Sequence, residues 1–210
     1  MKLLAFAVLA FALAFCNLGE RLKQLSGGNG SATNSSTNSS NKTAPESSGE
    51  KPNLTPAQQS IANSANEVKW EDQGVTWRLP NGWKKMEVKK ETFNYSSPDN
   101  AFLLVNISPM SSDFPMDSSR EAFYKQALDQ MKNGKYETVR YLDIDGMKGV
   151  EWREAMPEDK DGARRHQWIG YRNYLGQNQM LNVMLSTKGT NFDKHKDDFP
   201  AILYSTKFTK

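Results

Sequence analysis

The chain has 210 residues, of which 27 are basic and 24 acidic, so its formal net charge at pH 7 is +3. Proteins that bind nucleic acid usually carry a larger excess of positive charge, so we expect no nucleic-acid partner. Apart from three phenylalanines before position 16, every aromatic residue lies from Trp70 onward. Because a hydrophobic core needs large apolar side chains, we expect one globular domain at 67–210, long enough to fold without disulfides or a metal.

An uninterrupted apolar run opens the chain, from Leu3 to Phe15, directly after the basic residue Lys2. A helix that crosses a membrane needs about 20 apolar residues, so this run is too short to span a bilayer. A basic residue followed by a short apolar run is typical of a secretory signal peptide. The pattern therefore predicts an exported protein with a signal peptide at residues 1–15.

The only cysteine, Cys16, stands where the apolar run ends. The residues Leu13-Ala14-Phe15-Cys16 resemble the bacterial lipoprotein signal, although the residue before the cysteine is usually Gly, Ala or Ser and here is Phe15. The resemblance implies that Cys16 is acylated with a diacylglycerol (palmitate-type chains) and anchors the protein in the membrane of a bacterial cell envelope. Two alternatives remain: cleavage after Ala14 with soluble secretion, and an uncleaved anchor.

A segment of low complexity follows, in which residues 26–49 consist almost entirely of Ser, Gly, Asn and Thr. Such residues cannot bury apolar surface, so we expect a disordered, lipid-anchored tether over residues 16–66. Within it, Thr55-Pro56 is typical of a helix N-cap followed by proline at the first helical position. A short helix is therefore expected from Pro56 to about Asn63.

The domain is expected to begin with strands. Val68–Trp70 and Val75–Leu79 alternate apolar and polar residues on either side of a turn, which predicts a β-hairpin. Pro80-Asn81-Gly82 predicts a tight turn. Two further strands are expected near 91–96 and 101–108.

A helix is expected next, beginning at Asp117 or Ser118 and ending at Asn133-Gly134. Ser118 and Glu121 have the spacing of a capping box. One apolar stripe, which we expect to face the core, is formed by Ala122, Phe123, Ala127, Leu128 and Met131.

The sequence after Gly134 predicts a meander of long antiparallel strands followed by a closing helix. The strands are expected at 138–144, 147–155, 163–174 and 180–186. A final helical region is expected from Asn191 to about Ser205, interrupted near Pro200, which lacks the backbone N–H that a helix needs. The order of strands, helix, strands and helix predicts an α+β domain with helices packed on an antiparallel sheet.

Two acidic turns, Asp143–Gly146 and Asp159–Gly162, invite comparison with calcium loops. A calcium-binding EF-hand loop needs glycine at its sixth position, whereas glycine is fourth in both turns. Both are therefore interpreted as Asp-Gly hairpin turns.

Catalytic chemistry is not indicated. The only histidines are His166, expected in a strand, and His195, expected on the polar face of the last helix. Neither has carboxylate partners at a recognisable spacing for a metal or a general base. No phosphate-binding glycine loop or nicotinamide-binding fingerprint occurs. We therefore predict a non-enzyme without catalytic residues, cofactor or metal.

Aromatic and arginine residues offer binding anchors instead. The strand at 165–174 contains Trp168, Tyr171, Arg172 and Tyr174, and alternation along a strand places Tyr171 on the opposite face from the other three. We expect at least one face of this strand to be rich in such anchors, or else to belong to the core.

Three segments resemble PsbP-like domains, a group that includes DcrB-like bacterial lipoproteins. They are the Val75–Trp83 stretch with its Pro-Asn-Gly-Trp turn, the Tyr141–Gly149 hairpin, and the ending Phe199–Phe208. The resemblance implies an α/β/α sandwich around an antiparallel sheet. It also implies binding of proteins or small apolar groups, with no shared catalytic residues.

Together these observations favour a non-catalytic cell-envelope lipoprotein whose tethered domain binds a protein or apolar ligand. The first alternative is a secreted or surface-displayed factor that contacts extracellular or host molecules. The second is an enzyme of unknown chemistry.

Overall fold

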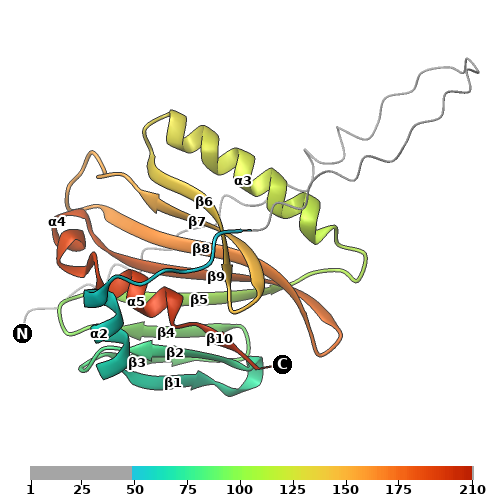
Figure 1. The fold of residues 1–210 in the computed structure, drawn as a ribbon, viewed down its shortest axis with the longest axis horizontal. Helices are drawn as coiled ribbons and strands as arrows, with labels where there is room; N and C mark the ends of the chain where they lie inside the picture. Colours follow the sequence, from blue (N-terminus) through green and yellow to red (C-terminus); the bar gives the residue numbers. More distant parts are fainter. Residues whose placement is uncertain (1–48, 210) are drawn as a thin grey trace, which may run out of the picture. The chain divides into compact units, whose positions relative to one another are not determined.

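The computed structural model describes residues 49–209, which fold into two antiparallel sheets with helices packed on them (Figure 1). The predicted α+β class is therefore confirmed. The predictions for the signal peptide, Cys16 and most of the tether lie outside the described residues.

The larger sheet has seven strands, in the order β3-β4-β5-β9-β8-β7-β6, and every neighbouring pair is antiparallel. The predicted strands at 91–96 and 101–108 and the four-strand meander are present in it. Its strands are β3 (Lys84–Val88), β4 (Thr92–Ser96), β5 (Phe102–Pro109), β6 (Tyr136–Ile144), β7 (Met147–Glu154), β8 (Ala163–Tyr174) and β9 (Gln177–Lys188).

The smaller sheet contains the expected first hairpin and has the order β1-β2-β10. Strands β1 (Asn66–Trp70) and β2 (Val75–Leu79) are joined by the 3₁₀ turn η1 (Glu71–Gln73). Gly74 closes this turn in a left-handed conformation with φ of 57°, which glycine adopts at little cost. Strand β10 (Lys207–Phe208) completes the sheet with the end of the chain.

Residues 49–66, which we expected to belong to the tether, pack on the domain. The predicted helix is present as α2 (Pro56–Ser64), capped by Thr55 and Gln58. It lies against the C-terminal helix α5 (Asp198–Tyr204), and Ala62 on it is buried. Glu50 forms a parallel bridge to the edge strand β6. The folded region therefore begins before residue 67, because Glu50 pairs with β6 and α2 packs on α5.

Helix α3 (Met116–Lys132) covers β6 and β7 (Figure 1). It ends where predicted, but it begins before Ser118, and its N-cap residue makes no side-chain capping bond, so the predicted capping box is wrong. The predicted stripe is also wrong in one place, because Ala122 is exposed and the buried residues of α3 are Arg120 and Ala127.

The closing helical region is divided into α4 (Gly189–Phe192), the 3₁₀ turn η2 (Asp193–His195) and α5. The expected interruption is present, but it precedes Pro200. That proline lies in the first turn of α5, where its missing N–H breaks no helical hydrogen bond.

Helices cover both faces of the large sheet, as the resemblance implied. The main core lies between the sheet and α4, α5 and the small sheet, and includes Trp168 and Phe199. A second cluster lies under α3 and includes Trp152 and Ile169. Trp168 and Ile169 are neighbours in β8, so their side chains point to opposite faces of the sheet. Among residues 49–209, no helix is both long and apolar enough to cross a membrane.

Candidate binding groove

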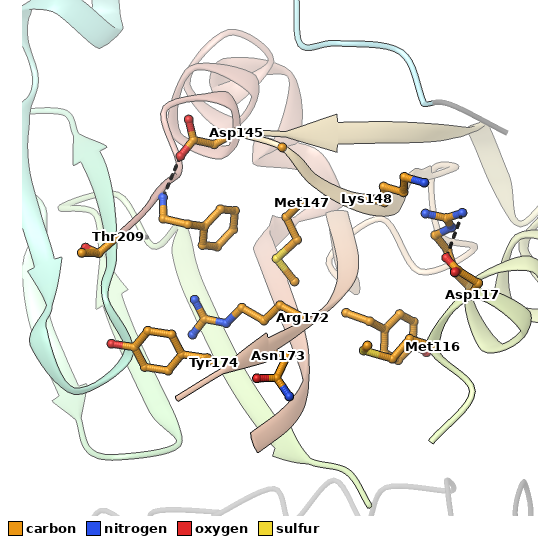
Figure 2. A pocket seen from close by; sticks show the side chains of 13 residues that line it. Met116, Asp117, Asp145, Met147, Lys148, Arg172, Asn173, Tyr174 and Thr209 are labelled. Atoms are coloured by element: carbon orange, nitrogen blue, oxygen red, sulfur yellow. Dashed lines mark hydrogen bonds and ion pairs between the residues drawn. The ribbon is translucent and has the colours of Figure 1, made fainter. Parts of the chain in front are cut away.

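A groove with a volume of about 390 Å³ lies where α3 begins, β6 turns into β7, β8 ends and β10 runs alongside (Figure 2). We call it the Arg172 groove. Its apolar and aromatic lining is formed by Met116, Met147, Tyr171, Tyr174 and Phe208. Its charged lining is formed by Arg120, Lys148, Arg172, Asp117 and Asp145.

Arg172 lies in the middle of this lining, between Met147 and Tyr174 in Figure 2. Its Nε donates to Gln179 Oε1 at 3.1 Å, and its Nη2 donates to the Gln73 carbonyl oxygen at 2.9 Å. The guanidinium carbon lies 4.3 Å from the centre of the Tyr174 ring. Burial lowers the pKa of Arg172, but a guanidinium stays protonated in proteins. Arg172 is thus a half-buried cation whose hydrogen-bond acceptors within residues 49–209 are all neutral.

Arg120 approaches the groove from α3 and is only 7% exposed. Its Nη2 lies 3.4 Å from the carboxylate of the exposed Asp117, and its guanidinium carbon lies 5.7 Å from the centre of the Tyr141 ring. Its buried Nε has no hydrogen-bond partner in the described part of the chain. A buried donor without an acceptor costs about 1–3 kcal/mol, so this arginine is incompletely satisfied.

The turn between β6 and β7 forms the third wall. Asp145 and Gly146 have φ angles of 49° and 85°, as a tight hairpin turn requires, which agrees with the predicted Asp-Gly turn. The Asp145 carboxylate accepts hydrogen bonds from Lys207 Nζ and from the backbone N–H of Phe208, both at 2.9 Å. The turn therefore holds β10, and with it the Phe208 ring, against the groove.

The predicted anchors on β8 divide between core and groove. Trp168 is fully buried, and its Nε1 donates to the Leu142 carbonyl oxygen, so it belongs to the core. Tyr171, Arg172 and Tyr174 line the groove.

His166 lies in a strand, as expected, but in a buried charged network away from the groove. Its Nε2 is 2.7 Å from Glu151 Oε1, and the Tyr204 hydroxyl donates to the same carboxylate at 2.6 Å. Arg140 donates to the other oxygen of Glu151. Burial alone would raise the pKa of Glu151, but these hydrogen bonds outweigh it and hold the pKa at about 2. Burial and the charge of Glu151 raise the pKa of Tyr204.

His195 is buried, so the expectation that it lies on a polar helix face is wrong. Its Nε2 is 3.1 Å from Asp99 Oδ2, and its Nδ1 is 3.0 Å from Asp198 Oδ2. Its ring stacks on Phe199. The error arose because three short helices replace one continuous helix, which turns His195 inward. Within residues 49–209, no cluster of three His, Cys, Asp or Glu side chains could hold a metal.

Comparisons with known proteins reveal similarity only at the level of structure. No family model matches the chain, and no curated protein matches its sequence. The cyanobacterial PsbP (CyanoP) of Synechocystis is 21% identical, with 70% of this chain and 93% of that chain covered and a TM-score of 0.44. The Ran-binding protein Mog1p of Saccharomyces cerevisiae is 10% identical, with 69% and 95% covered and a TM-score of 0.39. For a Bacteroides thetaiotaomicron protein, the chain spans less than half of that protein's length, 46%.

LpqN of Mycobacterium tuberculosis, described as involved in cell envelope biogenesis, is 15% identical and has a TM-score of 0.50. The alignment covers 76% of this chain and 99% of LpqN. Both proteins thus share one fold over nearly all of LpqN. With an antiparallel sheet covered by helices on both faces, the described domain has the layered α+β architecture that the resemblance implied.

Proposed function

We propose that this protein is a non-catalytic lipoprotein of the bacterial cell envelope whose domain binds a protein partner in the Arg172 groove. The observation that carries the proposal is the convergence of aromatic, methionine and arginine side chains from α3, β7, β8 and β10 on one open groove. Aromatic residues, methionine and arginine are enriched in protein interfaces, and tyrosine and arginine are frequent among the residues that dominate binding energy.

The groove is lined largely by residues of regular elements. Tyr171, Arg172 and Tyr174 belong to a twelve-residue strand paired along its length with β9. Pairing fixes the backbone that carries these side chains, so binding needs no further ordering of that backbone. This arrangement supports a recognition role.

Both histidines are engaged elsewhere, which supports a non-catalytic role. His166 is held by Glu151, and His195 by Asp99 and Asp198, and none of these residues lines the groove. The groove presents binding anchors, and its two carboxylates each have a cationic partner.

The envelope location rests on the lipoprotein-like signal that ends at Cys16. We propose a signal peptide at 1–15, a lipid-anchored tether from Cys16, and a globular domain that includes residues 49–66. LpqN, which shares the fold, is described as involved in cell envelope biogenesis and points in the same direction.

Photo-crosslinking in intact cells tests the binding role. A photoreactive benzoylphenylalanine at Asn173, an exposed residue of the groove, should give one discrete adduct with a partner protein. The same residue at Met156, which is 44% exposed and lies outside the groove lining, is the control site and should not give that adduct.

A steric variant provides the second arm. Met116→Trp should obstruct the rim of the groove and abolish a partner's capture by affinity-tagged protein, whereas Met86→Trp on the exposed strand β3 should leave it unchanged. Equal capture by both variants, or the same adduct from both crosslinking sites, would exclude the groove as the binding site.

A further inference from the structure

We infer that the Arg172 groove recognises a carboxylate on an acidic, partly apolar segment of its protein partner. This inference rests on the proposed function and specifies the ligand chemistry of the same site.

Arg172 has no anionic hydrogen-bond acceptor among residues 49–209. Its three hydrogen bonds within the domain come from Nε and Nη2 and reach only the neutral side chains and backbone of Gln73 and Gln179. Its Nη1 donates none within residues 49–209, so two N–H donors remain available. Withdrawing a charge from water costs free energy unless an opposite charge compensates it. A ligand anion would supply that compensation.

Arg120 is an independent second observation. It is more than nine-tenths buried, and its Nε has no acceptor in the described residues. The partner carboxylate, on Asp117, is 85% exposed and lies 3.4 Å away, so it neutralises the guanidinium only weakly. Two arginines that line one groove are thus incompletely paired, whereas Arg164 and Arg165, outside the groove, each contact a glutamate.

The charge of the lining favours an anion. Three cationic side chains and two acidic ones line the groove, and Lys207, outside the lining, pairs with the acidic Asp145, so the site carries an excess of positive charge. Because the proposed partner is a protein, the anion that its unmodified side chains offer is a carboxylate. Guanidinium groups also form strong charge-assisted hydrogen bonds with carboxylates.

The apolar lining indicates which residues flank that carboxylate in the partner. Met116, Met147 and Phe208 offer surface for apolar side chains, and methionine adapts its shape to varied partners. An extended peptide that carries Asp or Glu between apolar residues satisfies both kinds of surface.

Binding of defined peptide pools to the full-length protein tests the inference. Each pool fixes one central residue as Glu, Gln or phosphoserine, with apolar residues varied on both sides. We expect the Glu pool to bind about tenfold or more tightly than the Gln pool, with the difference falling as salt rises. Arg172→Gln should abolish this preference, and Arg172→Lys, which keeps the charge, should retain part of it.

Arg165→Gln is the matched control, because it changes an arginine on the same strand outside the groove and should leave the preference intact. The inference would be overturned if the protein bound the Glu and Gln pools equally, or if it preferred the phosphoserine pool. It would also be overturned if the protein bound laurate, a fatty-acid anion, but did not bind the Glu pool. Equal binding of the Glu and Gln pools by a wild-type protein that still forms the Asn173 adduct would overturn the inference while leaving the proposed function standing.

Discussion

Replacing Glu151 by Gln should destabilise the domain substantially. This carboxylate is only 4% exposed and joins three strands to the C-terminal helix through Arg140, His166 and Tyr204. Glutamine preserves the shape of the side chain but removes the charge. Its amide nitrogen would also meet groups that donate hydrogen bonds to the carboxylate, and a buried network with an unmatched member loses stability.

The pKa of Glu151 gives the size of the expected loss in unfolding free energy. Hydrogen bonds from its partners outweigh the cost of burial and lower the pKa from 4.5 to about 2. This shift corresponds to about 3 kcal/mol of unfolding free energy at neutral pH. For a domain of this size, the midpoint of thermal unfolding should fall by about 6–12 °C.

The pH dependence identifies the carboxylate as the cause. Because the pKa is lower in the folded state, the contribution of Glu151 is fully present above about pH 4.5 and is lost as the pH falls toward 2. Urea unfolding of wild type and Glu151→Gln should therefore differ most near pH 7. The difference should shrink steadily below pH 4.5.

Glu121→Gln serves as the matched control, since Glu121 is an exposed glutamate that pairs with Lys125 on the surface of α3. This variant should remain close to wild type at pH 7. If Glu151→Gln behaves like this control, or if its deficit is the same at pH 3 and pH 7, the buried carboxylate does not have the stabilising role assigned to it.

Three further predictions concern other parts of the chain. Cys16→Ser should abolish labelling by a palmitate analogue and release the protein from membranes; unchanged fractionation would contradict lipid anchoring. A chain that begins at Glu67 should still unfold in one cooperative transition in calorimetry, because every residue of the main core lies downstream, but at a lower temperature because it lacks Glu50 and α2. His195→Gln should lower the unfolding temperature, because Asp99 and Asp198 lose the imidazole ring that contacts both of them, while capture of a partner through the groove stays unchanged.

The elements that alternation or helical periodicity marks clearly could be predicted from the sequence. Strand β8 and the strands around it have long alternating patterns, which the structure confirms together with the tight turns at Gly146 and Gly176. The prediction of a hairpin turn at Asp159–Gly162 is wrong, because these residues form a hydrogen-bonded turn inside a longer loop, residues 155–162, and Gly162 does not have a positive φ. Strand β3 was not predicted because it is an edge strand exposed on nearly all its residues, with Met86 at 56% and Val88 at 37% exposure. A strand that buries almost nothing leaves little hydrophobic pattern to detect.

The groove could be predicted only in part, for a physical reason. Arg172 and Tyr174 belong to a strand whose composition indicated binding anchors. Arg120 occupies a helical position that sequence patterns assign to solvent, and it is buried only because α3 packs across β6, where Tyr141 contacts it. Contacts between elements that are distant in the chain determine such burial, and the periodicity of residues within one helix cannot predict them.

The end of β6 connects the two extremities of the described chain to the groove. Asp143 accepts a hydrogen bond from the Gly49 backbone N–H at 3.2 Å, and the Glu50 N–H donates to the Tyr141 carbonyl oxygen at 3.1 Å. Two residues further along the chain, Asp145 holds β10 through Phe208. The segment that leads in from the proposed tether is thus fixed to the strand whose turn forms one wall of the groove.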